Sequence, residues 1–303
     1  MSRQFLYLAL LMITSACSVY GQYYFYNEKY YNSLTLVEAG ISVGGMNCLT
    51  DLGGRKGKGS RFLKDINWNK SHLCAGVYFS LLYNQLFALR AEASMGKVSA
   101  DDNVLREDHS TARDRYNRNL HFKSSIAELY IVTECYPLSW LNGGSYPLFS
   151  PYLLGGIGFF RYNPMAKYEG QWMELNPLHT EGQGFKEYSP KQPYKLFQLN
   201  FPVGLGARYE MSALMSIRFE VIYRFLKTDY LDDVSTQYID PRMFYLYLDP
   251  QDAKIAERLA DRSGELHQGM INKAGEIRGN PQNRDAYFSF NVKAGMILNR
   301  KRR

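Results

Sequence analysis

The stretch FSFNVKAGMIL, residues 288–298, decides the fold class, because its side chains alternate in character along its whole length. Every second residue from Phe288 to Leu298 is apolar, whereas Ser289, Asn291 and Lys293 fall between them. Successive side chains of a β-strand point to opposite faces, so a period of two indicates a strand with one apolar and one polar face. The same alternation recurs at 197–209 and 215–225, and less regularly at 34–44, 73–83, 86–97, 122–135 and 149–162. The sequence therefore predicts eight strands, most of roughly 10–13 residues, and a tilted strand needs about 9–11 residues to cross a bilayer.

The connections between these strands alternate between short and long. The short ones cover about 84–85, 137–148 and 210–214, and the long ones about 45–72, 98–121, 163–195 and 226–286. Outer-membrane barrels have short periplasmic turns, longer outer loops, an even strand number and no open sheet edge. We therefore predict an all-β fold, an eight-stranded antiparallel transmembrane β-barrel with four long outer loops.

Charged residues at the polar positions of the strands predict the character of the lumen. They are Arg90, Glu92, Glu128, Glu134, Arg208, Arg218, Glu220, Arg224 and Lys293. An eight-stranded barrel is just wide enough for its own side chains to fill it. Charges of both signs then neutralise one another inside, which indicates a plugged lumen instead of a pore. Aromatic residues near strand ends suit an interfacial girdle, namely Tyr78, Tyr83, Trp140, Tyr152, Tyr162, Tyr209 and Tyr223.

Composition excludes two other classes of protein. The chain has 303 residues, of which 46% are hydrophobic, 15% aromatic and 21% charged, with a formal net charge of +7. A disordered chain would have far less apolar and aromatic content. Beyond the N-terminus no run of about 18 apolar residues occurs, so a helical membrane protein is excluded as well.

The N-terminal residues predict export from the cytoplasm. Arg3 precedes a short apolar run, and Val19-Tyr20-Gly21 resembles a cleavage site. We expect residues 1–21 to be a signal peptide and residues 22–303 to form the barrel domain in the cell outer membrane. An alternative is lipidation at Cys17, because Thr14-Ser15-Ala16-Cys17 loosely resembles a lipoprotein processing site.

The mature chain would keep three cysteines, an odd number in an oxidising compartment. Cys48 and Cys74 both fall near the outer rim of the predicted barrel, so they are candidates for a disulfide. Cys135 ends a strand at the periplasmic rim and has outward parity. It is a candidate contact for a partner protein, together with Trp140 and the basic tail of Arg300, Lys301, Arg302 and Arg303.

No constellation indicates catalysis, and the sequence predicts no enzyme activity and no cofactor. Asp108-His109-Ser110 is the only cluster of catalytic residue types, and adjacent residues do not converge on one reacting atom. The acidic cluster Asp229, Asp232, Asp233 and Asp240 suits loop capping or partner contact, with Ca²⁺ binding as an alternative.

Two features of the loops suggest further structure and contacts. The basic tract Arg55, Lys56, Lys58, Arg61 and Lys64 has lipopolysaccharide phosphates as a natural counter-charge, with a plain solvated loop as the alternative; nucleic acid is not expected outside the cell. In the last loop, Asp249 and Pro250 resemble a helix start, and Ile255, Ala256, Leu259 and Ala260 form a helical stripe that Gly264 would end.

Two motifs carry a family resemblance. Thr228-Asp229-Tyr230-Leu231-Asp232-Asp233-Val234-Ser235 is followed by Tyr238-Ile239-Asp240, and Arg278-Gly279-Asn280-Pro281 precedes the last strand. With Asp65-Ile66-Asn67 and the stretch 91–102, they resemble the PorG-like outer-membrane barrels of the Bacteroidota. In the first loop, Cys48-Leu49-Thr50-Asp51-Leu52 stands where relatives carry Tyr-x-Gly-Asp-Leu.

The resemblance implies a non-enzymatic component of the type IX protein secretion and gliding machinery. It implies that the barrel anchors a periplasmic ring made of a lipoprotein and its ring partner (PorK/PorN-like). The alternative from the residues themselves is a free-standing small surface barrel, either an adhesin that binds ligands through its long loops or a structural outer-membrane protein.

Overall fold

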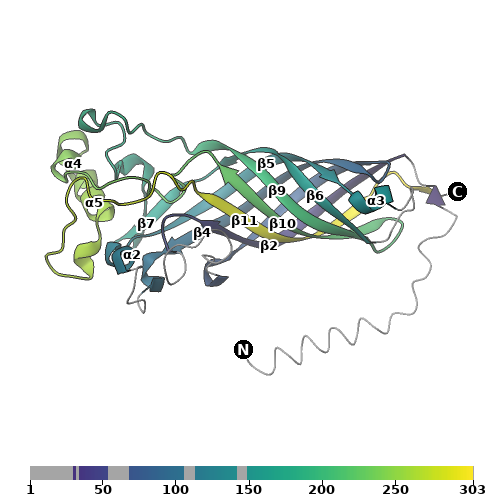
Figure 1. The fold of residues 1–303 in the computed structure, drawn as a ribbon, viewed down its shortest axis with the longest axis horizontal. Coiled ribbons are helices and arrows are strands. Elements are labelled where there is room, and N and C mark those ends of the chain that lie inside the picture. Colours follow the sequence, from purple (N-terminus) through teal and green to yellow (C-terminus); the bar gives the residue numbers. More distant parts are fainter. Residues whose placement is uncertain (1–29, 32–33, 54–67, 106–112, 142–148, 303) are drawn as a thin grey trace, which may run out of the picture.

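The computed structural model describes residues 30–31, 34–53, 68–105, 113–141 and 149–302. Eight long strands form one closed antiparallel barrel (Figure 1). They are β2 (Thr35–Leu49), β3 (His72–Tyr83), β4 (Phe87–Asp101), β5 (His121–Cys135), β6 (Phe149–Arg161), β9 (Phe197–Glu210), β10 (Met215–Leu226) and β11 (Ala286–Ile297). The eight strands predicted from alternation are confirmed. The proposed signal peptide and Cys17 lie outside the described residues.

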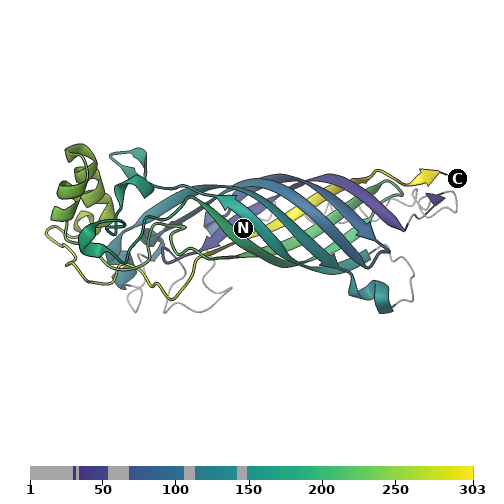
Figure 2. The ribbon, with the colours of Figure 1, turned by 90° about the horizontal axis from the view of Figure 1, so that it is seen from above.

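The barrel closes where the two ends of the strand order meet. The order is β4-β3-β2-β11-β10-β9-β6-β5, and an additional β4–β5 pairing completes the ring. In that pairing Phe87 lies opposite Cys135 and Asp101 lies opposite His121. All three short connections lie at one end of the barrel and the long loops gather at the other, as Figures 1 and 2 show. The predicted alternation of short and long connections is therefore confirmed.

Shorter elements extend both ends of the barrel. At the short-turn end, β1 (Tyr30–Tyr31) pairs with β12 (Lys301–Arg302) and helix α3 (Pro137–Leu141) lies in the β5–β6 connection. At the loop end, β7 (Pro164–Tyr168) and β8 (Gln171–Glu174) form a hairpin that continues the sheet beside β5.

The long loops also contain helices. They are η2 (Trp68–Lys70), η3 (Asp102–Leu105), α2 (Arg113–Arg118), η4 (Asn176–Leu178), η5 (Lys186–Tyr188), α4 (Arg242–Tyr247), α5 (Pro250–Ala260) and η6 (Ser263–Glu265). Among the described residues, no helix has both the length and the apolar character needed to cross a membrane.

Alternation along each strand separates an apolar exterior from a polar interior. On β3, Val77 is 59% exposed, whereas its neighbour Tyr78 is 4% exposed. Leu129 and Ile131 of β5 are likewise exposed, and Tyr130 between them is buried. An apolar band around a closed barrel is the surface that a bilayer requires.

The lumen is filled by a network of ion pairs. Arg218 donates from Nε to Glu38 at 2.9 Å and from Nη1 to Glu134 at 2.7 Å. Arg90 donates to Glu220 through both terminal nitrogens. The side chains of the network are all buried; the carboxylates are Glu38, Glu92, Glu128, Glu134, Glu210 and Glu220, and the cations are Arg90, Arg208, Arg218, Arg224, Lys293 and Arg300. The nine charged residues predicted to face inward all do so. Glu38, Glu210 and Arg300 join them, so six carboxylates meet six cations.

Part of the predicted aromatic girdle is wrong. Tyr78 and Tyr152 are buried inside the barrel, and Tyr162, which follows the end of β6, is buried in the core at the barrel mouth. Tyr78 donates its hydroxyl to Glu38 at 2.7 Å and lies against Arg218, so it belongs to the charge network. Tyr78 and Tyr152 occupy lumen positions of their strands, so the face on which a residue lies matters more than its nearness to a strand end. Tyr83 and Tyr209, at outward positions, are exposed.

Candidate functional site

The described parts of the long loops fold over the wide end of the barrel into one body, which we call the loop cap. It comprises residues 50–53, 102–105, 113–120, 162–196 and 227–285. Its apolar core contains Phe185, Phe244 and the buried face of α5. A second core, with Leu52, Leu231 and Val234, joins the cap to the barrel mouth. The loops are thus packed structure, and they position polar side chains in their interior.

Arg118, at the end of α2, ties three loops together. Its guanidinium forms a two-pronged contact with Asp102, with Nε–Oδ2 at 2.8 Å and Nη2–Oδ1 at 3.0 Å. The same group donates to the backbone carbonyls of Asp51 and Arg278. Asp102 also accepts from the backbone N–H of Gly53. Because both groups are buried, each satisfies the other's charge.

Arg278 of the second motif ties the third long loop to the fourth. Its Nη1 contacts Glu181 Oε1 at 3.0 Å and donates to the carbonyl oxygen of Asp233 at 2.6 Å. Glu181 also accepts from the backbone N–H groups of Ser235 and Thr236. The two motif regions, far apart in sequence, therefore meet around one buried carboxylate.

Position 279 requires a glycine, because Asp51 and Ser235 lie too close to leave room for a side chain. A Cβ at this position would lie 2.7 Å from Asp51 Oδ2 and 2.8 Å from the backbone of Ser235. The next residue, Asn280, donates its backbone N–H to the same Asp51 oxygen at 2.5 Å. Pro281 follows in an exposed turn before β11. The Arg-Gly-Asn-Pro motif thus holds the first loop against the last one.

The Asp-Tyr-Leu-Asp-Asp motif is mostly internal to the cap. Asp232 accepts the backbone N–H of Leu52 at 3.0 Å. Asp233 has a left-handed backbone (φ 66°), and its carboxylate accepts the hydroxyls of Thr180 and Tyr194.

The remaining motif residues lie closer to solvent. Asp229 accepts the Ser235 hydroxyl at 2.7 Å. Tyr230 stacks on Tyr194 with ring centroids 4.9 Å apart. Asp240 differs from the others, because its only described side-chain contacts are to Arg242.

The cap buries more carboxylate than it neutralises. Its fully buried carboxylates are Asp102, Glu181, Asp232, Asp233 and Asp285, and its fully buried cations are Arg118 and Arg278. Burial raises the pKa of Asp51 to about 6 and that of Asp229 to about 7. Burial first, and neighbouring carboxylates second, raise the pKa of Asp232 and of Asp285 well above its usual range. Asp229 therefore titrates near neutral pH, and Asp51 about one pH unit lower.

Loop capping, one of the roles predicted for the acidic cluster, is confirmed for Asp232, which accepts the backbone N–H groups of Leu52 and Val234. In the described part of the chain, no three His, Cys, Asp or Glu side chains are arranged to hold a metal ion. The Ca²⁺ alternative therefore gains no support.

The predicted helix of the last loop is confirmed as α5. Asp249 is its N-cap and Pro250 its first residue, and Ile255, Ala256 and Leu259 are buried. It ends at Ala260, earlier than the predicted stop at Gly264, because Asp261 already has an extended backbone. The neighbouring helix α4 was not predicted.

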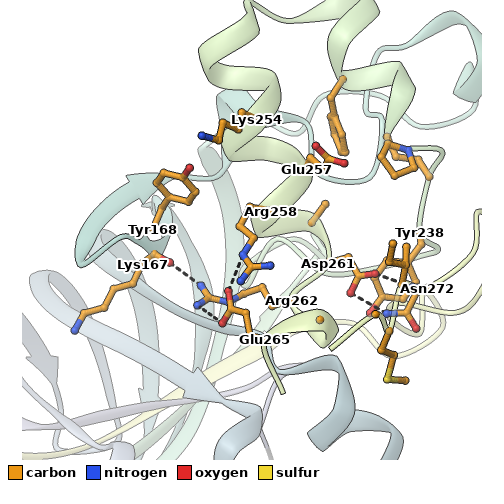
Figure 3. A pocket seen from close by; sticks show the side chains of 18 of the residues that line it. Lys167, Tyr168, Tyr238, Lys254, Glu257, Arg258, Asp261, Arg262, Glu265 and Asn272 are labelled. Atoms are coloured by element: carbon orange, nitrogen blue, oxygen red, sulfur yellow. Dashed lines mark hydrogen bonds and ion pairs between the residues drawn. The ribbon is translucent and has the colours of Figure 1, made fainter. Parts of the chain in front are cut away.

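A cavity of about 730 Å³, the α5 cavity, lies between α5, the β7–β8 hairpin and residues 261–272 (Figure 3). Its wall includes Lys254, Arg258 and Arg262 from one side of α5 and the residues after it, and Tyr168 from the hairpin. A second cavity of about 450 Å³ adjoins it, and Tyr238 lines both.

The predicted disulfide is wrong. Cys48 and Cys74 are both free and buried. Register explains why: Cys74 lies opposite Gly44, four residues from Cys48 along β2. Four strand residues span about 13 Å, whereas a disulfide requires Cα atoms within about 7 Å. The Cys74 thiol instead lies 3.3 Å from Asn291 Oδ1.

The candidate partner contacts lie at the short-turn end, with different degrees of access. Cys135 is free, half-buried and on the outward side of β5, as predicted. Trp140 belongs to α3, but its side chain lies outside the described residues. Arg300 is engaged, because it contacts Glu210 at 2.9 Å with its side chain 4% exposed. Lys301 and Arg302 form β12. Arg303 lies outside the described residues.

Sequence reasoning missed several residues that organise the cap. Arg118, Asp102 and Glu181 carry its central ion pairs. Arg118 and Glu181 belong to no motif identified in the sequence, and Asp102 was noted only as the end of the stretch 91–102. Their only signal is charge within loops, which ordinarily indicates solvent exposure. The loop tract 55–64 and Asp108-His109-Ser110 lie outside the described residues.

These features define the class of protein: an outer-membrane β-barrel with a plugged lumen and a folded loop cap. No family model matches the chain, and no curated protein matches it. Among solved structures it is similar to the attachment invasion locus protein Ail of Yersinia pestis, in complex with the heparin analogue sucrose octasulfate (8% identity, 87% of this chain and 97% of that chain, TM-score 0.35). It is also similar to Neisserial surface protein A (8% identity, 88% and 98%, TM-score 0.35) and to OprG of Pseudomonas aeruginosa (10% identity, 87% and 95%, TM-score 0.36).

Proposed function

We propose that the protein is a non-enzymatic anchor in the outer membrane that acts through what it binds at its two ends. The observation that carries this proposal is the filled lumen. Arg90, Arg218 and Glu134 lie at its centre with no exposed side-chain surface. A barrel filled in this way offers no water path for a solute, so neither transport through it nor catalysis within it is supported.

We further propose that the assembly it anchors is the type IX secretion machinery. The support is the resemblance of the two motifs, whose residues contact one another in the cap through Arg278 and Asp233. Under this proposal the short-turn end faces the periplasm. It would contact the ring lipoprotein and its partner through Cys135, α3 and β12, which all lie at that end of the barrel.

Purification in mild detergent tests this assignment. We expect a periplasmic ring protein to co-purify with the full chain, and a mixed disulfide through Cys135 to appear on non-reducing gels. Cys135→Ser should remove that species, whereas Cys74→Ser, which changes a thiol buried inside the barrel, should leave it. Purification without any periplasmic protein would contradict the assignment. Absence of the disulfide alone would contradict only the covalent contact.

A second candidate function is a free-standing surface barrel that binds ligands through its loops. The observation that favours it is the α5 cavity, a preformed hollow in the cap with polar and aromatic walls. Lipopolysaccharide at the outer loops is one candidate ligand. A ligand that binds the cap of a barrel purified without any periplasmic partner would favour this function over the first.

A further inference from the structure

We propose that the α5 cavity binds a phosphate monoester carried on a sugar-sized polar molecule. The size is suitable, because ligand sites are typically about 300–1,000 Å³ and this cavity measures about 730 Å³. The proposal does not rest on the type IX assignment, since it concerns the opposite end of the molecule.

Three cations recur at intervals of four residues and face the cavity. Lys254 and Arg258 lie on one face of α5, and Arg262 follows just beyond its end. Figure 3 shows the three side chains in one column opposite Tyr168. Among the described residues Lys254 has no ion-pair partner, and only Glu265 pairs with the two arginines, at 3.1 and 2.9 Å. The three cations therefore share one ion-paired carboxylate among the described residues.

The other acidic groups of the lining, Glu169, Glu257 and Asp261, form no ion pair with these three cations in the described structure. Asp261 is saturated, because Ser263 and Asn272 each donate to it twice. Glu257 accepts the hydroxyl of Tyr245 at 2.7 Å. Lys167 and Glu169 lie on the β7–β8 hairpin and offset one another. A phosphate monoester carries a charge of about −1.5 to −2 at pH 7, and it can pair with Lys254 and with the arginine N–H groups that Glu265 does not use.

The walls also offer polar groups and are held in place. The Nε of Arg262 is buried with no hydrogen-bond partner in the described structure. Arg262 donates from Nη1 to the carbonyl oxygen of Lys167 at 2.6 Å, which fixes the distance between the end of α5 and β7. Tyr168 provides an aromatic wall for a sugar ring, and Tyr238 a hydroxyl at the back. Because guanidinium groups pair well with phosphate in planar geometry, the positions of Arg258 and Arg262 suit such a ligand.

Binding to the full chain in detergent tests the proposal, with glucose 6-phosphate and glucose as soluble probes. Phosphorylated and dephosphorylated lipopolysaccharide form a second pair of probes. We expect a phosphorylated probe to bind saturably and its unphosphorylated counterpart not to bind. The Lys254→Gln/Arg258→Gln variant should bind at least tenfold more weakly. Binding of glucose 6-phosphate would indicate a free phosphate ester as the source, and binding of lipopolysaccharide alone would indicate the lipid.

A matched control removes two exposed cations from the same end of the molecule. Lys186→Gln/Lys195→Gln lowers the net charge equally but changes no residue of the cavity wall. Equal weakening in both variants, unchanged affinity in the cavity variant, or no saturable binding of either phosphorylated probe would overturn the proposal. Both variants should keep the gel shift of a folded barrel on boiling and any co-purified periplasmic protein, so this test is independent of the proposed anchor role.

Discussion

The lumen and the loop cap are both buried polar networks, but they differ in charge balance. Six carboxylates face six cations in the lumen, whereas five fully buried carboxylates face two arginines in the cap. Burying a charge is costly unless it is paired, so the balanced network is a permanent filling. The network in the cap has more carboxylates than cations, so it must take up protons or positive charge from the solution. Its stability should therefore depend on pH. The comparison indicates that the lumen network has a structural role, whereas the stability of the loop cap responds to the surrounding solution.

The largest effect should come from unbalancing the lumen. Arg218→Met would leave Glu134 and Glu38 without one of their cations inside the barrel. Breaking a buried ion pair by removing one partner costs about 3–5 kcal/mol. We expect a lower temperature for the gel shift of the folded barrel on heating. A second change, Glu134→Gln, should restore part of the loss. An unaltered unfolding temperature in Arg218→Met would show that the lumen network contributes little.

A smaller effect should follow from displacing the cap. In Gly279→Ala the new Cβ would clash with Asp51 and with the backbone of Ser235. Overpacking of this kind costs roughly 1–3 kcal/mol, here confined to the loops. We expect faster protease cleavage of the loops with an unchanged barrel. Gly45→Ala is the control, because nothing lies within 4 Å of a Cβ at that position. Equal cleavage of the two variants would contradict the close-packing argument.

The barrel could be predicted from the sequence because the polarity of each residue in a membrane strand indicates whether it faces the lumen or the lipid. The segment predicted at 215–225 is β10, Met215–Leu226, and the inward parity of its Arg218 is correct. The cap has no such local rule. Glu181 meets Ser235 across 54 positions, and that contact depends on how whole loops pack. The motif residues around Arg278 were found through resemblance alone, and their mutual contacts required the structure.

The disulfide error has a similar physical origin. The prediction rested on both cysteines lying near the outer rim of the barrel, but nearness to the rim does not give the register between strands. Pairing of Cys74 with Gly44 sets the offset along the strand. The two thiols therefore share a face and cannot meet.

The pH dependence of the cap should be a still smaller effect. Acids whose pKa is higher in the folded state than in the unfolded state stabilise the fold at low pH, and that contribution is lost as pH rises through the folded value. For Asp51 and Asp229 the loss should occur between about pH 4 and 7. Protease cleavage of the loops should accelerate from pH 5 to 8. Asp285→Asn should reduce this dependence, since Asp285 is buried among these acids. A rate that is the same at both pH values would contradict the idea of an unbalanced cap.

The smallest effect should be at the exposed edge of the cap, where charge pairs contribute little. Arg242 contacts Asp240 at 2.5 Å, but its side chain is 85% exposed. Water screens such a pair, and its formation costs side-chain entropy, so exposed pairs contribute little to stability. Arg242→Ala should therefore change neither the heat-induced gel shift nor the rate of loop cleavage. The informative contrast is Arg278→Ala, which leaves Glu181 buried without its ion-pair partner and should accelerate cleavage. If Arg242→Ala loosened the cap as much as Arg278→Ala, burial would not be what distinguishes its structural charges from its surface ones.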